Sequence, residues 1–377
     1  MTSVVFLEPA LSLINIPLRL FPHFTNSILR LIQDSPDFFN ISLTPTSLSV
    51  ICPQDVAHVL FRPIIDDLRP GSGATMEREE YVCMQIDGEG MGDGSRLLEL
   101  TQPLAQAGVS ILFITTYFSD YVLVAGRQIR KVRKVLAERG FDFEHLSQSF
   151  ITSAKPVSHG RHAPTHELSR SPSPLELTFD EDYEDVQETD MEQSSESLSD
   201  RIAQEQGVNT LQFLRQGKIP VRIAKDTKLV MLGSRVQFID YVMPLTRIFL
   251  KKELPEFFSI TKAPNTSPSL LVTQDLASEF DLDTLQGFDS AEVLIPIMLD
   301  LSDLESVGGL GGCGIVCGVV DELMQRALRP TPSSMEQMLI KEELVMSYLS
   351  TVVTGNVLVR QQDVARIAGN EGDCSVM

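Results

Sequence analysis

Basic residues are scarce in this sequence. It has 31 Lys and Arg residues against 51 Asp and Glu residues, which gives a formal net charge of −20. Nucleic acids and anionic membranes carry negative charge and would repel such a chain. The composition therefore excludes both of them as main partners.

Long hydrophobic runs are also missing. No stretch of twenty apolar residues occurs, and the N-terminus lacks the basic-then-apolar pattern of a signal peptide. We therefore expect a soluble cytoplasmic protein with no membrane insertion.

Cysteine is rare and odd in number. The five cysteines are scattered along the chain, at Cys52, Cys83, Cys313, Cys317 and Cys374. A disulfide framework needs an even set in a small secreted domain. We expect reduced and mostly buried thiols.

Hydrophobic residues still make up 43% of the 377 residues, enough for two to four domains with buried cores. The middle of the chain differs. Between Arg170 and Arg201 there are eleven acidic residues and no basic one. Such a segment cannot bury enough apolar surface to offset its chain entropy. It predicts a disordered acidic linker over residues 153–215.

Three histidines in that linker, His159, His162 and His166, have the spacing H-x-x-H-x-x-x-H. Three imidazoles can bind zinc. A loop that offers no partners to orient the rings is a poor zinc site. We therefore predict no metal site.

The parts on either side of the linker resemble each other. "FFNISLTPTSLSVICPQDVAHVLF" from Phe38 matches "FFSITKAPNTSPSLLVTQDLASEF" from Phe257. "VSILFITTYFSDYVLVAGRQI" from Val109 likewise matches "LVMSYLSTVVTGNVLVRQQDV" from Leu344. Each of these four stretches is predicted to form two strands that are joined by a turn and followed by a helix. The chain is therefore predicted to contain four units of two alternating types.

The second of these units predicts the order of elements most clearly. "EYVCMQI" is a strand, "RLLELTQPLAQAG" a helix ending at Gly108, and the next two β-rich runs form a hairpin around Ser119 and Asp120. The hairpin is followed by a helix that has Ile129 and Val132 on one face, and then by the strand "FDFEHL". This order is β-α-β-β-α-β, the ferredoxin-like plan, in which the exposed sheet favours pairing of units.

The fold class is thus α+β, with four ferredoxin-like units in two related pairs. The predicted boundaries are 1–75 and 76–152 for the first two units, 153–215 for the linker, and 216–287 and 288–372 for the last two.

The stretch "VGGLGGCGIVCGVVDELM" from Val307 contains the pattern G-x-G-x-x-G between a strand and a helix. A dinucleotide-binding domain needs further βα units after this turn and an acidic residue about twenty positions on. Only 63 residues follow Gly314, and they supply one helix, a hairpin and a short helix. We therefore reject a dinucleotide site. Two interpretations remain: the backbone N–H groups bind a carboxylate, or the turn serves close packing alone.

The repeated unit, with a glycine turn before its first helix, resembles the ACT domain, a small-molecule regulatory module. The four-unit chain resembles the CASTOR family of cytosolic arginine sensors, which act upstream of the TOR growth pathway. The likeness is clearest at "FFNISLTPTSLSVICPQD", "VSILFITTYFSDYVLV" and "GCGIV". It implies a ligand between the second and fourth units. The implied ligand-binding residues are Ser110, Ile111, Gly309, Gly312, Cys313, Gly314, Thr351 and Val352.

The chain departs from these sensors where they hold acids. Their turn reads G-F-D-E-C-G-I-V, whereas this one has Gly311 and Gly312 in place of both acids. The aspartate of their last hairpin is replaced by Gly355. Burying a guanidinium without its carboxylate partner costs roughly 3–5 kcal/mol. The departures therefore favour a small or apolar amino acid over arginine.

Three non-enzymatic readings stay open: an amino-acid sensor that signals through a regulatory complex of the GATOR type, a ligand-free ACT scaffold, and a regulatory subunit related to the ACT pair of aspartate kinase. An enzyme is not expected, because the sequence has no P-loop and no G-x-S-x-G, and His23, His58 and His145 are isolated. Cys313 is interpreted as a packing residue. We predict no catalytic residue and no cofactor, and we include a homodimer among the expected assemblies.

Overall fold

The computed structural model describes residues 3–86, 94–144, 220–287, 292–302, 314–328 and 344–368. The predicted linker at 153–215, the three linker histidines and most of the glycine turn lie outside these residues. The described elements fall into four successive segments, which we name by their order along the chain.

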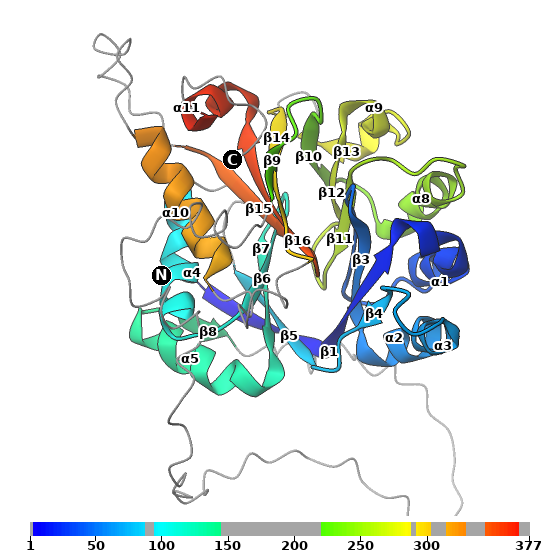
Figure 1. The fold of residues 1–377 in the computed structure, drawn as a ribbon, viewed down its shortest axis with the longest axis horizontal. Coiled ribbons are helices and arrows are strands. Elements are labelled where there is room, and N and C mark those ends of the chain that lie inside the picture. The colour runs from blue at the N-terminus through cyan, green and yellow to red at the C-terminus, as the bar shows by residue number, and fades with distance from the viewer. Residues whose placement is uncertain are drawn as a thin grey trace, which may run out of the picture. The chain divides into compact units, whose positions relative to one another are not determined.

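The first two segments precede the linker (Figure 1). The first contains β1 (Ser3–Pro17), α1 (Phe21–Asp34), β2 (Phe39–Leu43), β3 (Ser47–Pro53), α2 (Gln54–Leu60), α3 (Arg62–Asp67) and β4 (Thr75–Met76). The second contains β5 (Tyr81–Ile86), α4 (Gly94–Gln106), β6 (Ile111–Thr115), β7 (Asp120–Ala125), α5 (Ile129–Glu138) and β8 (Asp142–Glu144).

The last two segments follow the linker. The third contains β9 (Val221–Ile223), β10 (Leu229–Ser234), α8 (Val242–Phe249), β11 (Phe258–Lys262), β12 (Ser269–Thr273), α9 (Gln274–Ala277) and β13 (Leu285–Gln286). The fourth contains β14 (Leu294–Asp300), α10 (Ile315–Leu328), β15 (Met346–Ser350), β16 (Thr354–Arg360) and α11 (Val364–Ala368).

These elements confirm much of the predicted secondary structure. Both "FFNISL" and "FFSITK" form strands, and both Gln-Asp pairs open short helices. Gly108 has φ +66°, the left-handed conformation expected where α4 stops. The second segment has the predicted order β-α-β-β-α-β. The division into four units stays a prediction.

The hairpin of the second segment corrects one detail. Its turn covers Thr116–Ser119, and not Ser119 and Asp120 as predicted. The Thr116 N–H donates to the Ser119 carbonyl over 3.0 Å, and its hydroxyl donates to the same oxygen over 2.7 Å. Tyr117 and Phe118, which have high β propensity, are therefore in the turn.

All sixteen described strands belong to one sheet. Its order is β13-β10-β12-β11-β2-β3-β1-β5-β7-β6-β15-β16-β14-β9, with β4 and β8 beside β1. A further pair, Leu229↔Leu294, joins β10 to β14 and closes the path. The long strand β1 links the first two segments, because it pairs with β3 through Leu11–Pro17 and with β5 near its start.

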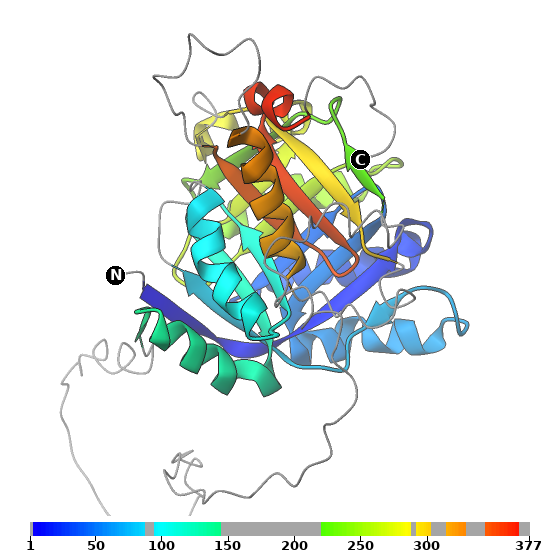
Figure 2. The same ribbon diagram turned by 60° about the vertical axis from the view of Figure 1, so that its left-hand side comes forward.

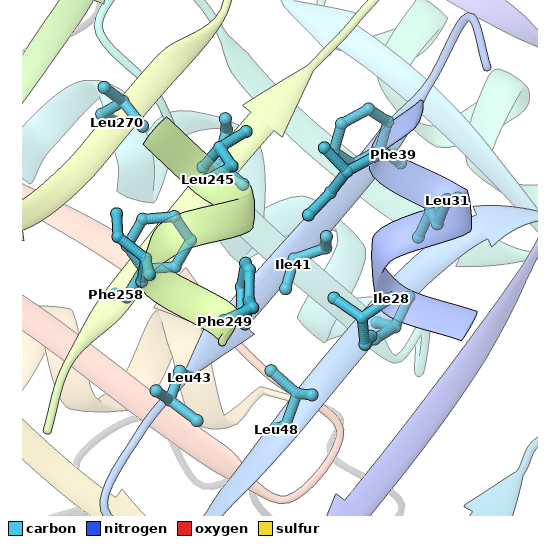
Figure 3. Packing of buried hydrophobic residues seen from close by; sticks show 14 of the residues in the cluster. Ile28, Leu31, Phe39, Ile41, Leu43, Leu48, Leu245, Phe249, Phe258 and Leu270 are labelled. Carbon is cyan, nitrogen blue, oxygen red and sulfur yellow. The ribbon is translucent and has the colours of Figure 1, made fainter. Parts of the chain in front are cut away.

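Helices gather on two separate stretches of this sheet. In both views α4 and α10 lie side by side over the second and fourth segments (Figures 1 and 2). The helices α1 and α8 contact each other over the first and third segments (Figure 1). Each group covers its own buried cluster. Figure 3 shows the cluster over the first and third segments, where Ile28 and Leu31 of α1 and Leu245 and Phe249 of α8 meet strand residues such as Ile41.

A third buried cluster lies on the opposite face of the strands. It includes Leu13, Ile51, Leu123, Leu271 and Leu358. Along β3, Leu48 and Val50 belong to the helix-side cluster while Ile51 belongs to this one. Because alternate residues of a strand point to opposite faces, β3 is buried on both sides. The sheet therefore has no solvent-facing side along β3.

Candidate functional site

The second and fourth segments meet where β6 lies beside β15, a boundary that we call the β6–β15 seam. One residue pair, Leu349↔Ile114, forms its described ladder. Two hydroxyl groups add bonds across it: the Phe113 N–H donates to Ser350 Oγ over 2.9 Å, and the Tyr348 N–H donates to Thr115 Oγ1 over 3.0 Å. Side chains thus replace part of the usual backbone pairing.

The equivalent boundary between the first and third segments is closed differently. There β2 and β11 pair over five residues, from Phe258↔Leu43 to Lys262↔Phe39. On the face away from the helices, Asn40 Nδ2 donates to Ser259 Oγ over 3.1 Å, and the hydroxyls of Ser42 and Ser259 are 2.8 Å apart. This boundary has a continuous ladder, whereas the β6–β15 seam does not.

The structure brings four of the predicted ligand-binding residues to one end of the β6–β15 seam. Strands β6 and β15 are antiparallel, so the start of β6 lies opposite the end of β15. Ser110 and Ile111 are at that start, and Thr351 and Val352 follow the end of β15. Ile111 and Thr351 are buried, and Ser110 and Val352 are half-buried.

The glycine turn is described only at its last residue. Gly314 has φ +76°, a conformation that favours glycine, and α10 begins directly after it at Ile315. Gly309, Gly312 and Cys313 lie outside the described residues, so their predicted role stays a prediction.

The start of α10 packs over the seam. Ile315 and Val316 share a buried cluster with Ile111, Phe113 and Tyr348. The first turn of α10 therefore lies in the same packed region as the strand residues of the seam. The N-terminus of this helix has a partial positive charge from its free N–H groups.

Helix α10 is also fixed against α4. Burial raises the pKa of the Cys317 thiol to about 11, and a hydrogen bond with the Thr101 side chain opposes that shift. Thr101 belongs to α4, and its hydroxyl donates to the Leu97 carbonyl over 2.8 Å. Cys317 thus acts as a packed contact between the two helices.

The turn after β15 is held by hydroxyl groups. The Thr354 N–H donates to Thr351 Oγ1 over 2.9 Å, and the Thr351 N–H donates to the Thr354 carbonyl over 2.8 Å. The tip also reaches the first segment, where the Val352 N–H donates to Ser49 Oγ over 3.4 Å. The end of the seam that holds Ser110, Ile111, Thr351 and Val352 therefore also contacts β3.

Gly355 follows that turn, and its lack of a side chain has a steric cause. A Cβ atom at this position would collide with the hydroxyl group of Tyr348. Tyr348 is fully buried, and burial raises the pKa of its phenol. The tyrosine therefore fills the space that a side chain at position 355 would need.

The described side chains of the seam are uncharged. Ser110, Thr115, Ser350 and Thr351 offer hydroxyl groups, and Ile111, Phe113 and Val352 are apolar. None of these side chains could provide a counter-charge for a buried cation.

The described residues provide no site for metal binding. No group of three or more His, Cys, Asp and Glu side chains there could hold a metal ion. His23 and His58 are exposed, and Cys52 and Cys83 are buried thiols whose pKa values are raised by burial. No described helix is long and apolar enough to cross a membrane.

The sequence predictions named neither Thr115 nor Tyr348, and they did not include Ser350 among the ligand-binding residues. Thr115 and Ser350 lie directly before the turns Thr116–Ser119 and Thr351–Thr354, and the hydroxyl of each accepts a backbone N–H of the other strand. A usable signal was present, because three hairpin turns repeat a threonine followed three residues later by serine or threonine, as in "TPTS" at Thr44. The contact of Tyr348 with position 355 had no such signal.

Comparison with known proteins adds a family match. The ACT-domain model matches residues 77–138, which run from just before β5 to the last residue of α5. None of the curated proteins matches the chain.

Solved structures show a weak likeness. A protein from Agobacterium tumefaciens is 17% identical, with 43% of this chain and 98% of that chain covered and a TM-score of 0.28. Aspartate kinase from Synechocystis is 10% identical, with 96% and 53% covered and a TM-score of 0.31. The ligand-free regulatory subunit of aspartate kinase from Thermus thermophilus is 14% identical, with 36% and 96% covered and a TM-score of 0.26. Residues 77–138 are therefore similar to an ACT domain, and with β8 the second segment has the β-α-β-β-α-β order.

Proposed function

We propose that this protein is a non-enzymatic amino-acid sensor built from four ACT-type units in two related pairs. One pair consists of residues 1–75 and 76–152, and the other of residues 216–287 and 288–372, with the linker between them. The ligand site is the end of the β6–β15 seam, between the second and fourth units.

The arrangement of the β6–β15 seam carries this proposal. The one described ladder pair between β6 and β15 is flanked by hydroxyl-to-backbone hydrogen bonds in place of a continuous ladder. Four of the eight residues expected to bind ligand lie at one end of this seam, and α10 begins in the same packed region. An α-carboxylate placed there would meet the N–H groups of a helix start, which favour negative charge.

The ligand is a small or apolar amino acid. A guanidinium would need carboxylates, and the described seam side chains are uncharged. Tyr348 also occupies the space beside Gly355 that an acidic side chain at that position would need. Gly309, Gly312, Cys313 and Gly314 contribute the backbone of the glycine turn.

The protein works through contacts with other proteins. In the proposal it is a divergent relative of the CASTOR-like sensors, resides in the cytoplasm and regulates a complex of the GATOR type in TOR nutrient signalling. The support for this is the resemblance of its sequence at the two repeated hairpins and at "GCGIV". A ligand-free scaffold is the competing outcome.

A thermal-shift screen of the twenty amino acids tests the proposal. A ligand that binds the folded state raises the melting temperature by an amount set by its concentration relative to its Kd. We expect a shift with at least one small or apolar amino acid. No shift across the whole panel would reject the sensor and favour the scaffold.

A pair of variants locates the site. Ser110→Ala removes a half-buried hydroxyl at the seam, whereas Ser278→Ala removes an exposed one whose bond stays within α9 and its cap. We expect the ligand-induced shift to fall in the first variant and to stay unchanged in the second. Equal shifts in both would place the ligand elsewhere.

A further inference from the structure

Helix α5 carries a dense group of positive charges, although the chain as a whole is strongly acidic. Two residues of this helix, Val132 and Leu136, are buried in the core shared by the second and fourth segments. The exposed side of the helix belongs to the outside of the second segment (Figure 1). Its exposed cations, which we call the α5 basic face, are Arg130, Lys131, Arg133 and Lys134.

The charges of the α5 basic face are not neutralised by their described surroundings. None of the four cations makes an ion pair with another residue that the structure describes, whereas Arg127, just before the helix, pairs with Glu79 over 2.9 Å. Arg130 lies three residues before Arg133 and four before Lys134, so like charges are neighbours on the helix surface. Such neighbours destabilise a helix, and a negatively charged partner would remove the repulsion.

One of these cations is held in place by an aromatic ring. The guanidinium carbon of Arg133 lies 4.6 Å from the centre of the Phe6 ring, and Phe6 stacks on Phe143 with ring centres 5.6 Å apart. Phe6 belongs to β1 and Phe143 to β8, so three elements form this stack. A guanidinium that lies on a ring keeps the N–H groups of its edge available for two parallel bonds to a carboxylate. Arg133 is therefore an ordered anion-binding group.

We propose that the α5 basic face binds an acidic segment of a partner protein. Its cations recur every three or four residues, which is one helical turn of about 5.4 Å. Alternate residues of an extended peptide point to the same side and lie about 6.6 Å apart. Carboxylates on alternate residues can therefore each reach one cation, and Arg133 binds the one that anchors the segment.

The small extent of the α5 basic face selects a short partner segment. Arg130 and Lys134 are only about 6 Å apart along the helix axis, and salt screens each charge beyond about 8 Å. Exposed acids border the face, with Glu138 at the end of α5 and Asp142 in β8. A nucleic-acid duplex or an anionic bilayer extends past the face and would meet these acids. The face shares no residue with the β6–β15 seam, so it stands or falls apart from the proposed ligand site.

Fluorescence anisotropy with the full chain tests the proposal. The probe is a labelled peptide in which glutamate alternates with serine, and the matched probe has glutamine in place of each glutamate. We expect the acidic probe to bind with a Kd on the order of tens of micromolar at low salt, and at least about tenfold more tightly than the glutamine probe. Raising the salt from about 50 to about 200 mM should weaken this binding at least about threefold, because the contact is electrostatic.

Paired variants locate the contact. Arg130→Gln combined with Lys134→Gln should raise the Kd for the acidic probe at least about tenfold. Lys228→Gln combined with Arg247→Gln removes the same two charges from exposed sites in the third segment and should leave the Kd within about twofold. Arg133→Lys keeps the charge but loses the planar fork, so it should raise the Kd about threefold.

Three results would overturn the proposal. If the full chain binds the acidic probe no better than the glutamine probe, the face takes no partner, either because it is idle or because the chain's own acidic stretch between Arg170 and Arg201 competes for it. Equal losses in the two paired variants would show that only net charge matters. Co-sedimentation with vesicles of phosphatidylcholine and phosphatidylserine that is lost in Arg130→Gln with Lys134→Gln would assign the face to a membrane surface.

Discussion

The buried side chain of Tyr348 restricts which residue can be at position 355. The tyrosine hydroxyl stands where a Cβ at position 355 would be, and Leu299 Cδ1 closes the same space from the next strand at 3.6 Å. Any residue other than glycine requires the tyrosine to move. The absence of an acid at position 355 therefore has a packing cause.

We expect Gly355→Ala to lower the free energy of unfolding by about 1–3 kcal/mol through overpacking. Tyr348→Phe removes the colliding oxygen, so the double variant should recover about 1 kcal/mol of that loss. Urea denaturation of the two single variants and the double variant measures the coupling. Strictly additive losses would show that the hydroxyl is not the obstacle.

Cysteine reactivity offers a second test at this scale. With its pKa raised to about 11 from an ordinary 9.0, Cys317 should hold about 100-fold less thiolate at pH 8 than a free thiol. Its alkylation by iodoacetamide, followed by mass spectrometry of the peptide, should be correspondingly slow. The rate should still rise about tenfold per pH unit at pH 9, where an ordinary thiol begins to level off. A rate like that of a free thiol would contradict the described burial.

The sequence predicted residue roles where a single local rule applied. Gly108 was expected to end a helix, and its positive φ confirms this. Buried thiols at Cys52 and Cys83 followed from composition and are also confirmed. The role of Tyr348 depends on which strands become neighbours, and no local pattern contains that information.

At the scale of elements, Lys262 connects two segments. It belongs to β11, and its Nζ donates to the carbonyl groups of Ser35 and Pro36 over 2.8 and 2.7 Å. Ser35 is the left-handed cap of α1, so the lysine satisfies carbonyls at the negative end of that helix. Burial lowers the pKa of Lys262, and the charge of Asp37 opposes this shift.

Lys262→Met should lower the free energy of unfolding by about 1–2 kcal/mol, since bonds to a charged donor are lost from a half-buried site. Lys251→Met is the matched control, because its pair with Glu279 is exposed and should contribute about 0–1 kcal/mol. Thermal or urea unfolding of both variants measures the two losses in the free energy of unfolding. Equal losses would mean that Lys262 contributes no more than a surface ion pair.

The threonine turns are a second feature of elements. Thr116 and Thr351 hold their hairpins in the same way, with a hydroxyl that accepts the N–H of the residue three positions on. Thr116→Val should lower the free energy of unfolding by about 1 kcal/mol. Thr246→Val, which removes a bond within α8 to the Val242 carbonyl, should cost less, because a helix does not need it. The reverse order would contradict a structural role for the turn.

At the scale of the whole molecule, repetition in the sequence predicted the elements but not their assembly. The matched hairpins at Phe38 and Phe257 gave the right strands. The closing pair Leu229↔Leu294 joins strands that no repeat relates. The burial of β3 along its whole length, with one buried cluster on each face, likewise appears only in the structure.

The candidate site was likewise predictable only in part. The residues expected at its two strand ends came from the resemblance to the CASTOR family, and the structure brings Ser110, Ile111, Thr351 and Val352 to one end of the seam. The weak pairing of β6 with β15 was not predictable, because register depends on contacts between distant segments. We propose that this end of the β6–β15 seam binds a small or apolar amino acid.

Titration calorimetry on one preparation tests that claim most directly, with leucine, serine, glycine and arginine as ligands and Gly312→Glu as the variant. We predict that at least one of the first three binds the parent chain and that arginine does not. The Gly312→Glu carboxylate should raise the affinity for arginine by supplying the missing counter-charge. Micromolar binding of arginine to the parent chain would contradict the account.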